Sequence, residues 1–273
     1  MKIFFSDLDG TLLDHAKKIG DRTRRALEGF IDAGGYFAVS TGRAMESAMA
    51  IQKELGLFYP RTFLIAYNGA QIYDCDRKKS IYRIGIDREL VGRIFALAAK
   101  HRVHIHTYND IDIVSPPVMD EQDAACIDYY RHAIHSPLLF TEDVLSHLPF
   151  PPGKCIAIEL KDLDKLEAFR KELEPMVSDT LTLLYSCPNY LEIFRKEAGK
   201  GAGLKNLCEY LHIPLSEAMA AGDEENDLSM IQAAGFGIAM KNGNPLLFDK
   251  ADAVTEEDND HDGLASYLEK FRP

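Results

Sequence analysis

Short apolar runs alternate with amphipathic segments over the first 70 residues of the chain. The apolar-rich runs at residues 2–5, 36–39 and 63–67 have the length and composition of strands. Between them, apolar residues recur at helical spacing at 26–31 and again within 45–55, and a glycine follows each segment. Strands that alternate with helices form parallel sheets with crossover helices. The sequence therefore predicts an α/β fold for this part of the chain.

The same alternation returns from residue 201. Residues 201–211 carry a helical stripe of leucines, and short strands are expected at 218–221, 237–240 and 253–255. The first and last thirds of the chain are therefore expected to build one parallel sheet together.

The middle third has a different pattern. Proline breaks at 116–117 and 149–152 interrupt it, and its expected strands are spaced as in an α+β unit. We therefore predict a discontinuous core of residues 1–82 and 189–273, with a cap domain inserted at residues 83–188.

Composition excludes several classes of protein. Hydrophobic residues make up 46% of the 273 residues, which excludes a disordered chain. Asp and Glu number 43 against 31 Lys and Arg, a net charge of −12. This balance argues against nucleic-acid partners and against docking on anionic membranes, because both need clustered basic residues.

The expected compartment is the cytoplasm. The apolar run at the N-terminus is interrupted at Asp7, whereas a secretory signal needs a longer one. No stretch approaches the roughly 18–20 apolar residues of a membrane helix. The five cysteines are scattered and include no CxxC pair, which argues against a disulfide framework or a zinc site.

Two aspartates stand two positions apart directly after the first expected strand. In extended chain, residues i and i+2 point the same way, so Asp7 and Asp9 would be neighbours at the carboxyl end of a strand. Open α/β sheets place their sites at that end. Close carboxylates repel each other unless a cation lies between them, and Mg²⁺ suits oxygen ligands. The alternative is an ordinary surface turn, because Asp-Gly pairs such as Asp9-Gly10 are common in turns.

Two further segments have the composition of anion sites. The segment STGR at 40–43 follows an expected strand and precedes a helix, so its hydroxyl groups and the helix amides would hold an anion. The alternative is a simple helix N-cap. Lys200 stands between two glycines at a helix start, where it would reach a phosphate as a point charge. The alternative is a solvated lysine in a flexible turn.

An acidic segment, GDEEND at residues 222–227, follows another expected strand. Several acids at one strand end are unfavourable unless they serve a cation. The alternative is a solvated helix start, which the helix dipole favours for acidic residues. Carboxylates, hydroxyl groups, a lysine and amides at strand ends and helix starts are together what phosphoryl transfer at a metal site requires.

In this order, DLDGT at 7–11, STGR, Lys200 and GDEEND resemble the four motifs of the haloacid dehalogenase superfamily of phosphatases. The companion segments NGA at 68–70, GIAM at 237–240 and HDG at 261–263 are most similar to its Cof-type branch, which has a type IIB cap. The resemblance implies a Rossmann-like parallel-sheet core with an α/β (α+β) cap inserted between the second and third motifs.

The resemblance also implies the catalytic and metal-binding residues. Asp7 would be the nucleophile and would form an aspartyl-phosphate, and Asp9 would be the general acid and then the general base. Mg²⁺ would be held by Asp7, the backbone carbonyl of Asp9, and Asp223, with Asp227 completing the surroundings of the metal.

Phosphate contacts are implied in the same way. Lys200 would also neutralise charge on the nucleophile and on the phosphate. Arg43 would either contact phosphate or pair with a nearby carboxylate. The residues expected to bind the phosphoryl group are Leu8 through its amide, Thr41, Gly42 through its amide, Lys200 and Asn226.

The expected protein is a Mg²⁺-dependent phosphomonoester hydrolase. Its substrates would be small phosphorylated metabolites, with sugar phosphates the favoured class, and the cap would close over them and set specificity. One alternative is a phosphotransferase or phosphomutase on the same fold. An alternative of another class is a non-catalytic regulator that binds a phosphorylated ligand.

Histidines in the cap are weaker candidates. His104 and His106 share one face of an expected strand, but a metal site needs a third convergent ligand, which the sequence does not identify. They would contact substrate or form an ordinary packed pair. His132 and His135 stand about one helical turn apart, with the same two alternatives.

Overall fold

The strand before the two aspartates lies inside a mostly parallel sheet. The computed structural model describes residues 1–57, 59–134 and 137–273, with residues 131–134 described by their backbone only. In it, β1 (Ile3–Ser6) lies between β2 (Tyr36–Ser40) and β12 (Ala218–Gly222) and is parallel to both. The first and last thirds of the chain therefore meet at β1, as the sequence pattern predicts.

The whole sheet has the strand order β14-β13-β12-β1-β2-β3-β4-β5. The strands from β14 to β3 run parallel, and β4 and β5 add an antiparallel edge. The predicted α/β fold is confirmed, but the β4–β5 hairpin was not expected from the sequence. The bounds of the remaining strands are β3 (Thr62–Ala66), β4 (Gln71–Asp74), β5 (Lys79–Arg83), β13 (Phe236–Ala239) and β14 (Ala253–Val254).

Alternation along β1 gives the sheet two apolar faces. Ile3 and Phe5 join a core cluster with residues of α6 and α7, whereas Phe4 points the other way and stacks on Phe37 of β2 at 6.0 Å between ring centroids. Burial on both faces is typical of parallel strands. The helices of this unit are α1 (Asp21–Asp32), α2 (Met45–Glu54), α6 (Lys200–Tyr210), α7 (Leu228–Ala233) and α8 (Ala265–Lys270).

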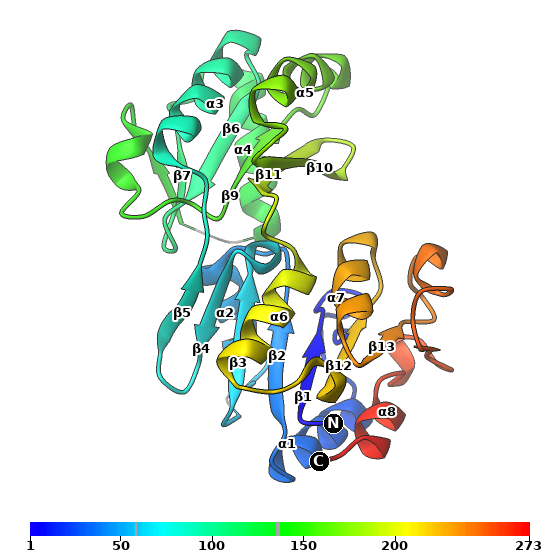
Figure 1. Cartoon of the computed structure of the whole chain (residues 1–273). Helices are drawn as coiled ribbons and strands as arrows, with labels where there is room; N and C mark the ends of the chain where they lie inside the picture. Colours follow the sequence, from blue (N-terminus) through cyan, green and yellow to red (C-terminus); the bar gives the residue numbers. More distant parts are fainter. Residues whose placement is uncertain (58, 135–136) are drawn as a thin grey trace. The chain divides into compact units, whose positions relative to one another are not determined.

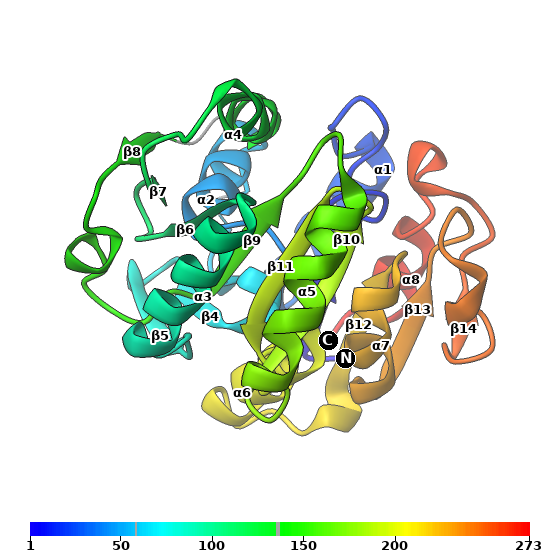
Figure 2. The ribbon, with the colours of Figure 1, turned by 90° about the horizontal axis from the view of Figure 1, so that it is seen from above.

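A second sheet, with the order β10-β11-β9-β6-β7-β8, belongs to the middle of the chain. Helices α3 (Arg88–His101) and α5 (Leu163–Val177) contact each other and share an apolar core with one face of this sheet. Figure 2 shows these two helices next to β9, β10 and β11. The other elements are α4 (Glu121–Ile134), β6 (His104–Tyr108), β7 (Ile113–Ser115), β8 (Leu138–Phe140), β9 (Lys154–Ile158), β10 (Leu181–Cys187) and β11 (Tyr190–Arg195).

Two compact units result, Met1–Arg83 with Ala198–Pro273 and Ile84–Glu197 (Figure 1). The expected start of the insertion, at residue 83, differs from this division by one position. The expected end, at residue 188, falls between β10 and β11, and β11 pairs antiparallel with both β10 and β9. The second unit therefore extends to residue 197, because a hairpin cannot be divided between two sheets without losing its backbone hydrogen bonds.

Among the residues that the structure describes, no helix combines the length and the apolar character needed to cross a bilayer.

Candidate active site

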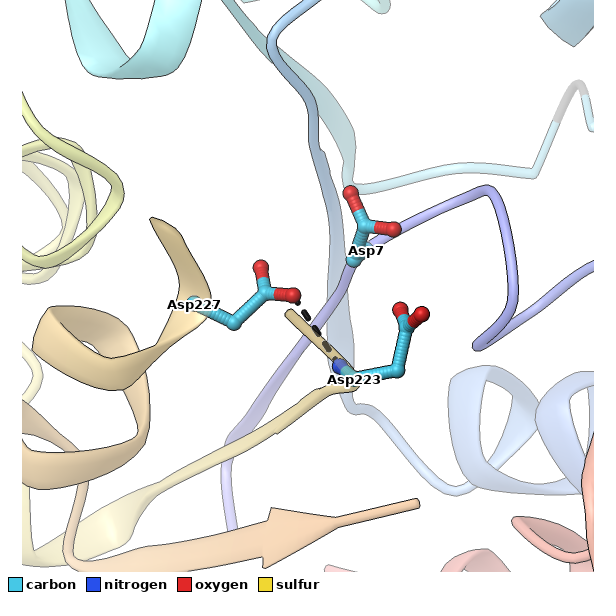
Figure 3. A group of neighbouring side chains, drawn as sticks. All are labelled: Asp7, Asp223 and Asp227. Atoms are coloured by element: carbon cyan, nitrogen blue, oxygen red, sulfur yellow. Dashed lines mark hydrogen bonds between the residues drawn. The ribbon is translucent and has the colours of Figure 1, made fainter. Parts of the chain in front are cut away.

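Three aspartates meet at the carboxyl ends of two adjacent parallel strands. Asp7 follows β1 and Asp223 follows β12, and the pairing of Ser6 with Ala221 brings these two strand ends side by side. Asp227 lies in the next turn of the chain. Each of the three offers a carboxylate oxygen within 4.8 Å of the others, and Figure 3 shows their carboxyl groups. We call Asp7, Asp223 and Asp227 the acidic cluster.

The turn after Asp7 is shaped to receive Asp223. Gly10 has a φ of 84°, and a Cβ atom there would lie 2.3 Å from an oxygen of the Asp223 carboxylate. Both the left-handed backbone and the close approach require glycine. Thr11 donates its hydroxyl proton to the other Asp223 oxygen at 2.6 Å. The Gly-Thr pair of the first motif therefore positions the aspartate of the fourth.

Lys200 supplies a buried positive charge for the cluster. It is the first residue of α6, its side chain is 1% exposed, and its Nζ lies 2.6 Å from Asp7 and 2.5 Å from Asp227. A Cβ atom at Gly201 would lie 2.3 Å from the carbonyl oxygen of Ser229, so the helix begins against a neighbouring segment. Lys200 is thus a fixed ammonium group and not a solvated lysine in a flexible turn.

Asp227 is engaged through both of its carboxylate oxygens. Oδ1 accepts from Lys200, and Oδ2 accepts from the backbone amides of Asp223 and Glu224, each at 3.0 Å. These bonds hold Lys200 against Asp7 and fix the turn that carries Asp223. The oxygens of Asp7 and Asp223 have fewer protein partners, so these two are the better placed to bind a cation.

The acidic cluster has three carboxyl groups for one ammonium group, and burial disfavours the charged forms of two of them. Burial raises the pKa of Asp7 to about 7, because the effect of Lys200, which lowers it, is smaller, and the charge of Asp227 raises it further. Burial likewise raises the pKa of Asp223 to about 6. For Lys200, burial lowers the pKa, but Asp7 and Asp227 together hold it above its usual value. Three carboxylates around one ammonium group therefore fit an additional divalent cation bound through oxygen.

The β2–α2 connection forms the second part of the site. Thr41 is buried, its backbone N–H donates to Ile65 at 2.8 Å, and its hydroxyl oxygen accepts from the Arg43 amide at 3.2 Å. A Cβ atom at Gly42 would lie 3.0 Å from Oδ1 of Asn68. These contacts fix the backbone of the loop that was expected to bind phosphate.

Asn68 joins this loop to the fourth motif, a role that was not expected from the sequence. It lies after β3 with a φ of 52°, and its Oδ1 accepts from Nδ2 of Asn226 at 3.4 Å. The Asn68 side chain therefore lies beside Gly42 and bonds Asn226, and its backbone amide donates to the carbonyl oxygen of Thr41 at 3.1 Å. The signal in the sequence was an asparagine followed by glycine at a strand end, since asparagine tolerates left-handed backbone.

Leu8 takes part through its backbone. Its side chain is buried in the core, and its carbonyl oxygen accepts from the Leu13 amide at 2.8 Å. No acceptor for its own N–H lies among the residues that the structure describes. The role expected for this amide, as a donor to the phosphoryl group, is taken up below.

Among the residues that the structure describes, the Asp9 carboxylate is not part of the acidic cluster. β1 ends at Ser6, so the alternation expected to align Asp7 with Asp9 does not continue past the strand. Arg43 donates to Asp9 at 2.9 and 3.0 Å, and Lys17 donates at 2.7 Å. Burial by itself would raise the pKa of Asp9, but Arg43 and Lys17 together lower it. Arg43 thus pairs with a carboxylate, and Lys17 is a site residue for which the motifs held no signal.

The histidines of the second unit lie in a different environment. His104 hydrogen-bonds Asp123 at 2.6 Å and His106 at 3.2 Å, and all three are buried. The third partner is thus a carboxylate on α4, and these side chains form a hydrogen-bonded chain, not a set of ligands around one point. His135 lies outside the described residues, as does the side chain of His132.

Comparison with known proteins places this fold and site. The family model for haloacid dehalogenase-like hydrolases matches residues 4–268. The chain belongs to this family, as its motifs suggested. It is 30% identical to phosphatase YwpJ of Bacillus subtilis, over 98% of this chain and 99% of that protein.

Two further comparisons agree with this. The chain is 30% identical to the 5-amino-6-(5-phospho-D-ribitylamino)uracil phosphatase YwtE of Bacillus subtilis, over 99% of this chain and 98% of that protein. A crystal structure of a haloacid dehalogenase-like hydrolase from Bacteroides thetaiotaomicron superposes with a TM-score of 0.87 at 28% identity, covering 98% of each chain. Together with the family match, these relatives show that the chain is an enzyme of the phosphatase class.

Proposed function

We propose that this enzyme is a magnesium-dependent phosphomonoester hydrolase that acts on small phosphorylated metabolites through an aspartyl-phosphate intermediate. The observation that carries the proposal is the environment of Asp7. Its carboxylate is buried at a strand end, 2.6 Å from the ammonium group of Lys200, and it lies in the acidic cluster with Asp223. A carboxylate held in this way is a nucleophile in a site built for an anionic substrate.

The first half-reaction would transfer the phosphoryl group to Asp7. One Asp7 oxygen attacks phosphorus and forms the acyl-phosphate bond while the bond to the leaving oxygen breaks. Lys200 remains beside Asp7, where its charge reduces repulsion between the carboxylate and the phosphate dianion. The Leu8 amide, Thr41, the Gly42 amide and Asn226 would hold the phosphoryl oxygens during transfer.

Proton transfer is the proposed role of Asp9. It would give a proton to the leaving oxygen in the first half-reaction and take one from the attacking water in the second. Water attack then breaks the acyl-phosphate bond, releases inorganic phosphate and regenerates the Asp7 carboxylate. Such proton transfer typically contributes about 10²–10⁴-fold to a rate.

The metal would be held by Asp7, Asp223 and the backbone carbonyl of Asp9. Asp227 would act through Lys200 and through the amides of the Asp223 turn, because those groups already occupy both of its oxygens. When bound, Mg²⁺ would supply positive charge that offsets the surplus of carboxylates and attracts the phosphate.

Phosphorylated sugars and related polyols are the proposed substrate class, and the cytoplasm is the proposed location. YwtE is by its name a phosphatase of a phosphoribitylamino compound, a phosphate ester of this chemical kind. All five cysteines are free, as is usual in a reducing compartment. The second unit is an α+β insertion, and we assign it the role of the cap that the motifs imply. It is the proposed determinant of substrate specificity.

The test is phosphate release from a panel of phosphate esters with and without Mg²⁺. We expect Mg²⁺-dependent turnover with inorganic phosphate as the product, even when a sugar acceptor is present. Asp7→Asn should lower turnover by on the order of 10³-fold or more, because it removes the nucleophile. The matched control is Asp32→Asn at an exposed position in α1, which should keep full activity. Full activity in Asp7→Asn would falsify the assignment of the nucleophile.

A further inference from the structure

A short segment after β13 contacts both loops that carry the proposed metal ligands. It comprises Asn242, Gly243 and Asn244, and we call it the 242–244 segment. One of the two loops follows β1 and carries Asp7, and the other follows β12 and carries Asp223. Contacts from one segment to both loops restrain the distance between them.

The first contact is made to the turn after β1. Nδ2 of Asn242 donates to the carbonyl oxygen of Gly10 at 2.8 Å, and Oδ1 accepts from the backbone amide of Asn259 at 3.1 Å. Gly10 is the residue whose missing side chain leaves room for the Asp223 carboxylate. It also shares a peptide bond with the Asp9 carbonyl group, a proposed ligand of the metal. The Asn242 side chain therefore restrains this turn from outside the acidic cluster.

The second contact is made to the backbone of Asp223. The Asn244 amide donates to the Asp223 carbonyl oxygen at 2.7 Å. A Cβ atom at Gly243 would lie 2.8 Å from that oxygen and 2.9 Å from Cα of Asp223, closer than side-chain carbons approach in proteins. Glycine is therefore required at this position, because the two backbones pack directly on each other.

The 242–244 segment is itself held to the sheet and to the chain beyond β14. The Gly243 amide donates to the carbonyl oxygen of Met240 at 2.8 Å, and the Met240 amide donates to that of Gly222 at 3.0 Å. Just before the segment, the Lys241 amide donates to the hydroxyl oxygen of Thr255 at 2.8 Å. These bonds give the segment a fixed position from which it supports both loops.

Mg²⁺ and Ca²⁺ differ in how strictly they require such a fixed distance. Mg²⁺ needs near-ideal octahedral geometry with oxygen ligands at about 2.0–2.1 Å, whereas Ca²⁺ accepts a flexible arrangement at about 2.3–2.6 Å. A small displacement of one ligand-bearing loop should therefore weaken Mg²⁺ binding more than Ca²⁺ binding. Groups that orient metal ligands without touching the metal typically contribute about 10–100-fold to affinity.

We propose that the 242–244 segment fixes the spacing of the Asp7 and Asp223 loops and thereby makes the site selective for Mg²⁺ over Ca²⁺. The inference rests on the proposed function, whose metal site it uses, and extends it to residues outside the four motifs. Asn242 and Gly243 are positioning residues in this account. Neither is charged, so their substitution leaves the electrostatic attraction for a divalent cation unchanged.

The experiment measures the dissociation constants of Mg²⁺ and of Ca²⁺ by calorimetric titration of the metal-free protein. In Asn242→Ala the turn at Gly10 loses its restraint, and in Gly243→Ala the added methyl group displaces Asp223. In each variant we expect the dissociation constant of Mg²⁺ to rise about 10–100-fold and that of Ca²⁺ to rise less than about 3-fold. A role in folding alone would not change the ratio of the two constants.

The matched control is Gly92→Ala in α3, where an added Cβ atom would lie 3.4 Å from a side-chain carbon of Leu145, an ordinary contact. It should leave both constants unchanged. If neither Asn242→Ala nor Gly243→Ala weakens Mg²⁺ binding more than Ca²⁺ binding, the selectivity role is overturned, and the phosphatase function is unaffected by that result. If the wild-type protein binds no Mg²⁺, the proposed metal dependence itself fails, and this inference fails with it.

Discussion

Each unit of the protein buries a cluster of titratable side chains, and the two clusters differ in how their charges and hydrogen bonds balance. The first is the acidic cluster, where three carboxylates surround Lys200. The second, which we call the histidine chain, lies between β6 and α4. It comprises Asp123, His104, His106, Tyr108 and Tyr130.

The histidine chain satisfies its own hydrogen bonds. His104 bonds Asp123 through one ring nitrogen and His106 through the other, and His106 continues to the hydroxyl group of Tyr108 at 3.2 Å. Tyr108 in turn bonds Tyr130. Both ring nitrogens of each histidine thus have partners. Polar networks of this kind make a buried interior specific and rigid when every member is paired.

The acidic cluster is not balanced within the protein. Burial raises the pKa values of Asp7 and Asp223, which means that their charged forms are unfavourable without a further cation. The comparison teaches that burial of titratable groups does not by itself identify an active site. Buried charge that the protein itself does not balance is the better indication of an active site, because a bound ligand can balance it. The following predictions test this difference, from the largest expected effect to the smallest.

Removal of the central cation should have the largest effect on folding. Lys200→Met leaves Asp7 and Asp227 buried without their ammonium partner, and loss of one member of a buried ion pair costs about 3–5 kcal/mol. Urea unfolding measures the change. Lys205→Met, at an exposed position of the same helix, is the control. Adding Asp227→Asn to Lys200→Met should recover part of the lost stability. If stability does not recover, surplus negative charge is not the cause of the loss.

Metal binding should stabilise the protein through the acidic cluster and not through the histidine chain. Mg²⁺ at about 100 times its dissociation constant adds about 2.7 kcal/mol to the free energy of unfolding. Thermal unfolding with and without Mg²⁺ should show this shift in the wild-type protein and in Asp123→Asn, but not in Asp223→Asn. If the shift is lost in Asp123→Asn and kept in Asp223→Asn, the metal binds at the histidine chain and not at the acidic cluster.

Breaking the histidine chain should reduce stability without reducing turnover. His106→Phe leaves a ring nitrogen of His104 without its partner, whereas the hydroxyl group of Tyr108 keeps its bond to Tyr130. An unsatisfied buried group costs about 1–3 kcal/mol. Urea unfolding and kcat/KM on the same sample separate the two effects. Loss of activity with unchanged stability would mean that the histidines contact substrate.

The two clusters should respond to pH in opposite directions in the metal-free protein. The raised pKa values of Asp7 and Asp223 mean that the folded state binds more protons than the unfolded state, so stability should fall as pH rises from about 4 towards 7. For His106, burial and the charges of His104 and Lys154 lower the pKa, so stability should fall as pH drops below about 6.5.

Unfolding midpoints between pH 4 and 8 distinguish these contributions, each of which changes stability by at most about 1.4 kcal/mol per pH unit. Asp223→Asn should remove part of the decline towards neutral pH, and His106→Phe should remove part of the decline towards acid. If neither variant alters the profile, burial of these groups does not control the pH dependence.

Much of the fold could be predicted from the sequence because its signals are local. The strand before Asp7 was expected within one position, and the helical spacing at 26–31 lies within α1. The β4–β5 hairpin was missed because β5 is largely exposed and has no apolar periodicity. β11 was assigned to the wrong unit because its pairing with β9 joins residues more than 30 positions apart. Local periodicity carries no information on such pairing.

The site residues likewise divide into those with a local sequence signal and those brought together only by the fold. Asp7, Lys200 and Asp223 were expected together because each stands at a strand end or helix start with a characteristic neighbour. Lys17 was missed because its contact with Asp9 depends on the path of the loop that joins β1 to α1. Asn68 was missed because its partner, Asn226, lies in a separate loop. Asp123 was missed as the partner of His104 for the same reason, since α4 must first pack on β6.

The sequence by itself determined the alternation of strands and helices and the chemical identity of the groups at the strand ends. Both depend on residues within a few positions of one another, where periodicity and turn chemistry act directly. Only the tertiary structure decided how those groups are charged and held. The pKa of Asp7 depends on its burial with Lys200, which lies 193 positions away, and the orientation of Asp9 depends on Arg43 and Lys17. Desolvation and charge–charge contacts are properties of the packed chain, and no local pattern contains them.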